Sequence, residues 1–347
     1  MIVGVSGFGS TGSGAVMDLL REYDDVTCGK NVELSFLYDP DGILDLEYNL
    51  VKNPIRFYSG DAAIKKFKKS IFSCDSIRYI GRSMSIDTFK NLTNEYVSDL
   101  LVAQYEGALW GYDRRQANKF QYFLKFLLGG KFLRIFDKLH IRQPVKFFDY
   151  KMYTPVHDDR FYVATKKYTS KLIDAMCKEK GDIIAMDQPF PSNNPSICFK
   201  FFNQKCKAIV VNRDPRDLYL VSKMNPCGWE LRFTPTNTVE DFITYYRDQM
   251  TLIRHDDESV LYVQFENLIY NYDEEIARIA KFLNISKHTK TKQFFDPKIS
   301  IANTQMILRF PEMRGDIAKI EKELPEFLYP FDTSKADLST KIWNFKK

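Results

Sequence analysis

The chain has 347 residues, enough for one large domain or two smaller ones, and its 44% hydrophobic content is ordinary for a globular protein. The 50 Lys and Arg against 45 Asp and Glu leave a formal net charge of +5, which suits an anionic ligand but does not indicate nucleic-acid binding. Six cysteines without a CxxC pair, and not grouped with the four histidines, exclude the usual metal-ligand spacings and indicate reduced thiols.

The start of the chain has the pattern of a strand and lacks the features of a signal peptide. No apolar run approaches the ~20 residues that a membrane-spanning helix requires. We therefore expect a cytoplasmic protein that uses no metal.

A glycine-rich loop follows the first predicted strand. Residues 2–5 are an apolar strand, residues 7–14 contain four glycines, and residues 15–23 have an apolar stripe with helical spacing. Such a loop lets backbone N–H groups close around a phosphate, and the helix N-terminus adds partial positive charge. The pattern predicts a phosphate-binding loop.

Two templates fit this loop. Gly7-Phe-Gly9-Ser-Thr-Gly12 satisfies the dinucleotide pattern G-x-G-x-x-G, which would make the chain an NAD(P)-dependent oxidoreductase with a Rossmann fold. The same run also satisfies most of the P-loop pattern, except that Ser13 stands in place of the lysine. A tight turn that binds no ligand is the third interpretation.

The rest of the chain alternates between strand and helix patterns, which predicts an α/β fold with a central parallel sheet flanked by helices. The expected strands are 182–187, 207–212 and 259–264, and the expected helices are 86–106, 117–137, 160–179, 238–254 and 272–283. Residues 1–347 are expected to form a single domain with a mainly helical insertion at about 85–180. Within it, residues 120–136 mix aromatic and basic side chains. They predict either a contact with a membrane surface or lipid-linked acceptor, or a helical pair packed on the core.

An arginine ends the strand at 207–212. Arg213 is followed by Pro215 at the start of a predicted helix and by Asp217 in its first turn. Arginine at the carboxyl end of a parallel strand faces the crevice where α/β folds bind ligands, and its planar fork matches a phosphate. The alternative is a surface arginine paired with Asp217.

Arg213-Asp-Pro-Arg-Asp217 resembles the second nucleotide motif of the sulfotransferases that use 3′-phosphoadenosine 5′-phosphosulfate (PAPS). The strand, turn and helix at 260–283 and the tripeptide at 314–316 are similar to later segments of that family. The resemblance covers about residues 2–35 and 180–316. It implies a P-loop-like three-layer fold, with PAPS as co-substrate and no metal.

The resemblance also implies site residues. The 5′-phosphosulfate would lie on the loop and the 3′-phosphate on Arg213, with Ser222 nine residues further along where the family serine is usually eight. The implied cofactor-binding residues are Gly9, Ser10, Thr11, Gly12, Ser13, Gly14, Arg213, Ser222, Arg314 and Gly315. The family's loop cation is replaced here by Ser10, and Lys30, Arg82 or Lys166 would have to supply it.

Sulfuryl transfer needs a general base. Glu33 lies one predicted helix beyond the loop, and Glu33-Leu-Ser-Phe36 resembles the pattern around the base of glycan-type members. His157 is the second candidate, and His140 is also available, because cytosolic members use a histidine.

We therefore expect a sulfotransferase that acts on a hydroxyl or amine of a carbohydrate-like acceptor, with no nucleic-acid partner. The alternatives are an NAD(P)-dependent oxidoreductase and an inactive nucleotide-binding homologue.

Overall fold

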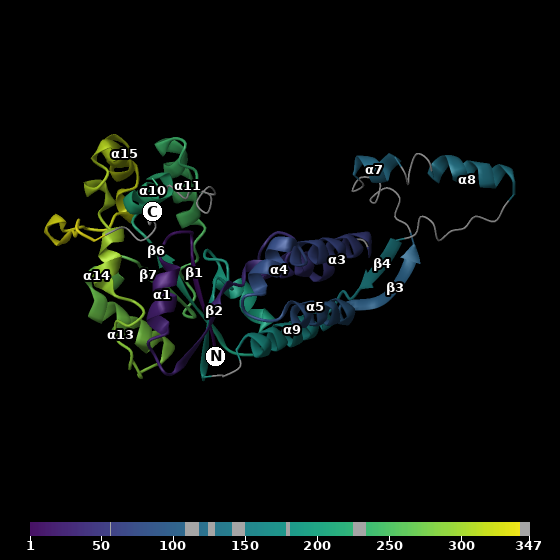
Figure 1. Cartoon of the computed structure of the whole chain (residues 1–347), viewed down its shortest axis with the longest axis horizontal. Coiled ribbons are helices and arrows are strands. Elements are labelled where there is room, and N and C mark those ends of the chain that lie inside the picture. The colour runs from purple at the N-terminus through teal and green to yellow at the C-terminus, as the bar shows by residue number, and fades with distance from the viewer. Residues whose placement is uncertain are drawn as a thin grey trace. The chain divides into compact units, whose positions relative to one another are not determined.

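The computed structural model describes residues 1–55, 57–107, 118–123, 129–140, 150–177, 181–224 and 234–340. The chain divides into two compact units (Figure 1). The first contains Met1–Tyr38, Arg78–Phe89 and Thr169–Lys347, and the second contains Asp39–Ile77 and Lys90–Tyr168.

The first unit is built on a five-stranded sheet with the order β2-β5-β1-β6-β7. All neighbouring strands are parallel. The strands are β1 (Ile2–Gly7), β2 (Val26–Glu33), β5 (Ile183–Asp187), β6 (Cys206–Asn212) and β7 (Val260–Gln264). The expected parallel α/β sheet is confirmed, because the apolar runs of β1, β5 and β6 are buried on both faces.

Strand β2 is the one strand of this sheet that the sequence did not predict. Its sequence Val-Thr-Cys-Gly-Lys-Asn-Val-Glu is polar and contains a glycine. It pairs only with β5, so it is an edge strand. An edge strand has one neighbour and tolerates polar residues, and its pattern is therefore weak in the sequence.

Apolar layers cover both faces of this sheet. Helices α1 (Ser13–Leu20) and α13 (Tyr272–Leu283) pack on the face that carries Val3 and Val5. On the opposite face, the ring of Phe190 fills the space above Gly4, where a side chain would collide with it. The other helices of this unit are α10 (Pro215–Met224), α11 (Val239–Thr251), α12 (Asn267–Tyr270), α14 (Pro297–Ser300) and α15 (Arg314–Glu323).

The second unit contains helices and a two-stranded antiparallel sheet, β3 (Leu101–Gly107) with β4 (Tyr150–Pro155). Buried hydroxyl pairs, Thr93 with Tyr168 and Tyr96 with Thr165, join two of its helices. The helices that lie wholly or partly here are α2 (Ile43–Glu47), α3 (Phe57–Ile71), α4 (Cys74–Ile80), α5 (Ile86–Asp99), α7 (Lys119–Gln121), α8 (Gly129–Lys138) and α9 (Arg160–Met176).

The helix expected over 86–106 is wrong in its last third. Helix α5 ends at Asp99 and strand β3 begins two residues later. Cross-strand pairing with β4, which lies far away in the sequence, overrides the local helical pattern. The single domain with an insertion at about 85–180 stays a prediction. The second unit also includes residues 39–77, which precede that insertion.

Within the described ranges, no helix is long and apolar enough to cross a membrane. The same ranges hold no group of three or more His, Cys, Asp or Glu side chains placed to share a metal ion.

The turn between β1 and α1 depends on glycine at defined positions. Gly9 and Gly12 have φ of 79° and 103°, in the left-handed region, and Ser10 joins them at 52°. A Cβ on Gly12 would collide with the ring of Phe265, whereas a Cβ on Gly14 would meet no atom within 4 Å. Glycine is therefore required at position 12, whereas position 14 has room for a side chain.

This difference predicts opposite effects on stability. Gly12→Ala should lower the melting temperature by at least about 4 °C, because left-handed backbone and overpacking each cost about 1–2 kcal/mol. Gly14→Ala should leave it unchanged or raise it slightly, because alanine favours a helix. Thermal unfolding of the two variants checks this, and equal melting temperatures would contradict it.

Candidate functional site

A cavity of about 400 Å³ opens in the first unit beside the glycine loop. This volume is in the range of small-ligand sites. The loop and α1 form one wall, residues 294–303 form the facing wall, and Arg213 and Phe265 also line the cavity. The lining residues are Ser10, Gly12, Ser13, Gly14, Ala15, Asp18, Arg213, Phe265, Phe294, Phe295, Asp296, Ile299, Ser300 and Asn303.

Arg213 joins the two walls of this cavity. Its Nη1 donates a hydrogen bond to the Ser10 carbonyl at 2.8 Å, and its Nη2 donates to the Asn303 carbonyl. The guanidinium carbon lies 5.3 Å from the centre of the Phe265 ring. The residue is only 4% exposed, and its Nε is buried without a partner among the described residues. The interpretation as a surface arginine is wrong.

Three buried carboxyl groups surround Arg213: Asp214, Asp217 and Glu266. Asp217 accepts hydrogen bonds from the backbone N–H groups of residues 305 and 306, at 2.9 and 2.8 Å. Glu266 accepts one from the N–H of Asp214 at 3.0 Å. Burial, together with the neighbouring carboxylates, raises the pKa values of Asp217 and Glu266. Arg213 opposes both shifts, so it is the counter-ion of this cluster as well as part of the cavity.

The turn after β5 holds the glycine loop in place. The Gln188 side chain accepts from Gly7 N–H at 3.3 Å and donates to the Ser13 hydroxyl at 3.2 Å. The Ser192 hydroxyl donates to the Gly7 carbonyl at 2.8 Å. Inside the loop, the Thr11 hydroxyl accepts from Phe8 N–H at 3.1 Å. These bonds fix the loop before any ligand binds.

No side chain caps the N-terminus of α1, because Gly12 occupies the N-cap position. The first amides of a helix lack intrahelical acceptors. The cavity wall formed by Ser13 and Gly14 therefore offers backbone donors and the positive end of the helix dipole to an anion.

Glu33 ends strand β2 and lies beside Asp187, its register partner at the end of β5. Register partners on parallel strands place their side chains on the same face of the sheet. Glu33 is exposed. One oxygen of Asp187 is buried without a hydrogen-bond partner in the described part of the chain. Burial and the charge of Glu33 raise the pKa of Asp187 to about 6, while Arg21 lowers it.

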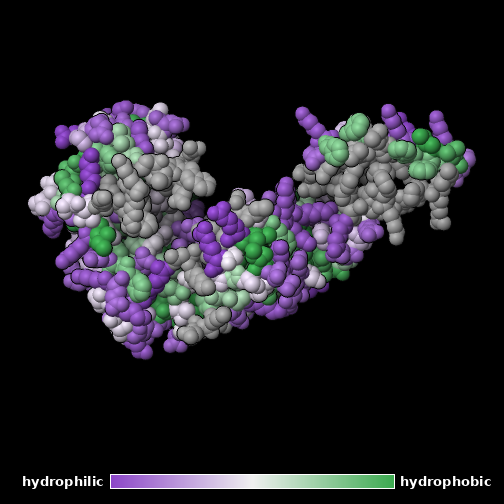
Figure 2. Space-filling view, viewed as in Figure 1, coloured by the Kyte–Doolittle hydropathy of each residue, from purple (hydrophilic) through white to green (hydrophobic). Residues whose placement is uncertain are grey.

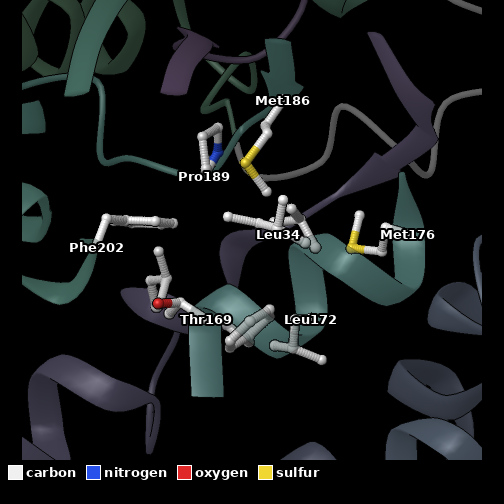
Figure 3. Close-up of a pocket in the computed structure, with 10 residues that line it drawn as sticks. Leu34, Thr169, Leu172, Met176, Met186, Pro189 and Phe202 are labelled. Carbon is white, nitrogen blue, oxygen red and sulfur yellow. The ribbon is translucent and has the colours of Figure 1, made fainter. Parts of the chain in front are cut away.

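The chain neighbours of Glu33 and Asp187 are Leu34 and Met186, and their side chains are part of the apolar core. Leu34 and Met186 line a small apolar gap together with Met176, Pro189 and Phe202 (Figure 3). Its volume of about 10 Å³ has room for no more than a water molecule. The gap is part of the core beneath the strand ends, and an acceptor molecule does not fit in it.

Of the predicted site residues, Ser10, Gly12, Ser13, Gly14 and Arg213 line one cavity. The structure thus brings the two predicted motifs together. Gly9 and Thr11 shape the loop that carries this wall.

The other predicted residues lie elsewhere. Ser222 is on α10, and its hydroxyl is buried without a partner among the described residues. Arg314 and Gly315 are exposed in the first turn of α15. His157, in the second unit, bonds through Nδ1 to the Leu50 carbonyl at 3.0 Å, and His140 is exposed after α8. Their roles stay predictions.

Of the proposed replacements for the loop cation, Arg82 and Lys166 are not among the residues that line the cavity. Arg82 lies in the turn after α4, Lys166 lies on α9 in the second unit, and the Lys30 side chain is outside the described residues. A cation that the sequence analysis missed is Arg21. It forms an ion pair with Asp18, which lines the cavity, and its charge lowers the pKa of Asp187.

Sequence reasoning also missed the facing wall at 294–303. Asp296-Pro297 begins the short helix α14, and the Asp296 side chain caps it by accepting from Lys298 N–H at 2.9 Å. An Asp-Pro pair is a recognisable helix start. It could have predicted the helix, but not that the helix faces the glycine loop.

A protein-family model matches the part of the chain that contains the second motif. Residues 193–326 match the family model of the sulfotransferase domain, and this segment contains Arg213. The match confirms the sulfotransferase resemblance. No curated protein matches the chain.

A search of solved structures gives the sulfotransferase domain from the Synechococcus PCC 7002 olefin synthase. The two sequences are 11% identical, the alignment covers 89% of this chain and 81% of that one, and the TM-score is 0.38.

The raised pKa of Asp187 predicts a pH-dependent stability. A carboxyl whose pKa is about 6 when folded and 3.8 when unfolded costs stability as the pH rises through this window, by about 1–3 kcal/mol in all. Asp187→Asn should therefore raise the melting temperature relative to wild type more at pH 7.5 than at pH 4. Asp256→Asn, at an exposed position, is the control. A pH-independent difference for Asp187→Asn would contradict the assignment.

Proposed function

We propose that this chain, a sulfotransferase, takes a sulfuryl group from PAPS and transfers it to a hydroxyl or amine of a carbohydrate-like acceptor. The observation that carries the proposal is the cavity shared by the glycine loop and Arg213, within a chain that matches the sulfotransferase domain at 193–326. The reaction is proposed to take place in the cytoplasm, in agreement with the reduced thiols of Cys28 and Cys206.

The shape and donor set of the cavity fit the donor nucleotide. The uncapped amides of α1 suit a 5′-phosphosulfate, and Gly14 leaves open space on this wall. Arg213 suits the 3′-phosphate, because it lines the cavity and its buried Nε lacks a partner among the described residues. When bound, PAPS supplies an activated sulfuryl group, and the rest of the chemistry falls to side chains.

In this proposal Glu33 is the general base. It would take the proton from the acceptor hydroxyl as the acceptor oxygen bonds to sulfur and the bond from sulfur to the 5′-phosphate oxygen breaks. The neighbouring Asp187 supports this role, since a second carboxylate on the same sheet face makes proton uptake by the pair more favourable. Asp18 connects the pair to the cavity, because it lines the cavity and acts on the pKa of Asp187.

Charge on the leaving phosphate needs a cation that Ser10 does not supply. Arg213 reaches the Ser10 carbonyl, and Arg21 pairs with Asp18 at the cavity wall. We propose that Arg21 exchanges its Asp18 partner for the phosphosulfate when the donor binds. The alternative is an inactive homologue that binds the nucleotide but transfers nothing, and the absent loop cation is the observation that favours it.

The donor assignment predicts selective stabilisation. Adenosine 3′,5′-bisphosphate should raise the melting temperature of the protein, and NAD(H) should not. Arg213→Lys keeps the charge of the acidic cluster but loses the fork, so it should reduce the preference for the bisphosphate over AMP by about 10- to 100-fold. Isothermal titration measures both affinities. An unchanged preference would contradict the 3′-phosphate assignment, and stabilisation by NAD(H) alone would favour the oxidoreductase.

The base assignment predicts loss of turnover without loss of binding. Glu33→Gln should lower transfer from labelled PAPS to a panel of saccharide acceptors by about 10²- to 10⁴-fold, with unchanged bisphosphate affinity. Glu274→Gln, on the exposed face of α13, is the matched control. Retained turnover in Glu33→Gln would move the base to His157 or Asp187, which His157→Gln and Asp187→Asn would separate. Tight binding without transfer to any acceptor would favour the inactive homologue.

A further inference from the structure

Helix α8 presents an exposed apolar stripe. Phe132, Ile135 and Leu139 are 59%, 49% and 61% exposed. Leu139 follows the last residue of the helix, but its N–H bonds to the Ile135 carbonyl at 3.0 Å and continues the turn. At about 100° per residue, these three side chains fall within an arc of about 60°. They form one stripe along one side of the helix.

A stripe of cations runs alongside. Lys131, Arg134 and Lys138 are exposed and also fall within an arc of about 60°, whose centre lies about 100° from that of the apolar stripe. Asp137 is on the remaining side. Figure 2 shows apolar and hydrophilic residues close together over α7 and α8.

We propose that α8 lies on an anionic membrane surface. Its apolar stripe would enter the boundary between headgroups and acyl chains, while the Lys and Arg stems keep their charges at the lipid phosphates. Phe120 on α7 and Phe123, two residues after that helix, add two exposed aromatic side chains, at 70% and 51%. The charge pattern selects this occupant over a second copy of the chain, because a second α8 would bring three more cations to the same seam.

The helix has 10 residues, so its contact with a membrane is short and depends on charge as well as on apolar burial. Dependence on charge distinguishes binding at the membrane surface from insertion across the membrane. Each cation near an anionic surface strengthens binding by about fivefold. Binding is therefore expected to require anionic lipid and to weaken in salt.

Sedimentation of the full chain with vesicles tests the proposal. Wild type should bind vesicles of 70% phosphatidylcholine and 30% phosphatidylserine, and bind phosphatidylcholine alone far more weakly. Phe132→Ser with Ile135→Ser should lower the partition coefficient at least about tenfold. Lys131→Gln, Arg134→Gln and Lys138→Gln together should lower it about a hundredfold. Circular dichroism confirms that each variant is folded.

Two controls carry matched changes at other exposed positions. Val163→Ser removes an apolar side chain that is 68% exposed on α9, and Lys322→Gln removes a cation whose side chain is 82% exposed. Both should bind vesicles as the wild type does. Equal binding to the two vesicle types, full binding by the α8 variants, or equal loss in the controls would overturn the proposal. Self-association without lipid that the Phe132→Ser, Ile135→Ser variant abolishes would assign the stripe to a second copy instead.

Discussion

The first unit depends on one buried cation. Arg213 is placed among Asp214, Asp217 and Glu266, where an unpaired carboxylate would be costly. The same guanidinium donates to carbonyls on the glycine loop and on the facing wall, at Ser10 and Asn303. The Arg213 side chain therefore has two roles: it compensates the charge of the three buried carboxyl groups, and it links the two walls of the cavity.

This coupling has a consequence for ligand binding. Carbonyl oxygens are neutral acceptors, so a phosphate that reaches the guanidinium would replace weaker hydrogen bonds with charge-assisted ones. The acidic cluster would oppose the approach of an anion, but Asp217 and Asp214 are already held by backbone N–H groups and by Arg216. These partners leave the charge of Arg213 available to the cavity. The turn at Gln188 and Ser192 holds the loop in position.

Strand pairing brings together the two carboxyl groups at the edge of the sheet. Glu33 and Asp187 are more than 150 residues apart, and only the pairing of β2 with β5 places them on one face. One oxygen of Asp187 is buried without a partner among the described residues, which is a cost to folding. A buried carboxyl group with a raised pKa, such as that of Asp187, is typical of functional sites. Under the proposed function, this cost is a requirement of the chemistry.

Sequence patterns predict the parallel sheet, the glycine loop and the arginine at the end of β6, because buried strands and tight turns have strong local patterns. They do not predict the polar edge strand β2, the end of α5 at Asp99 or the antiparallel pair β3–β4, since these depend on partners distant in the chain. The folded chain is needed to see that residues 294–303 and the glycine loop line one cavity, that Arg213 is buried and that Asp187 lies beside Glu33. Burial and long-range pairing are properties of the packed chain, and no short stretch of sequence contains them.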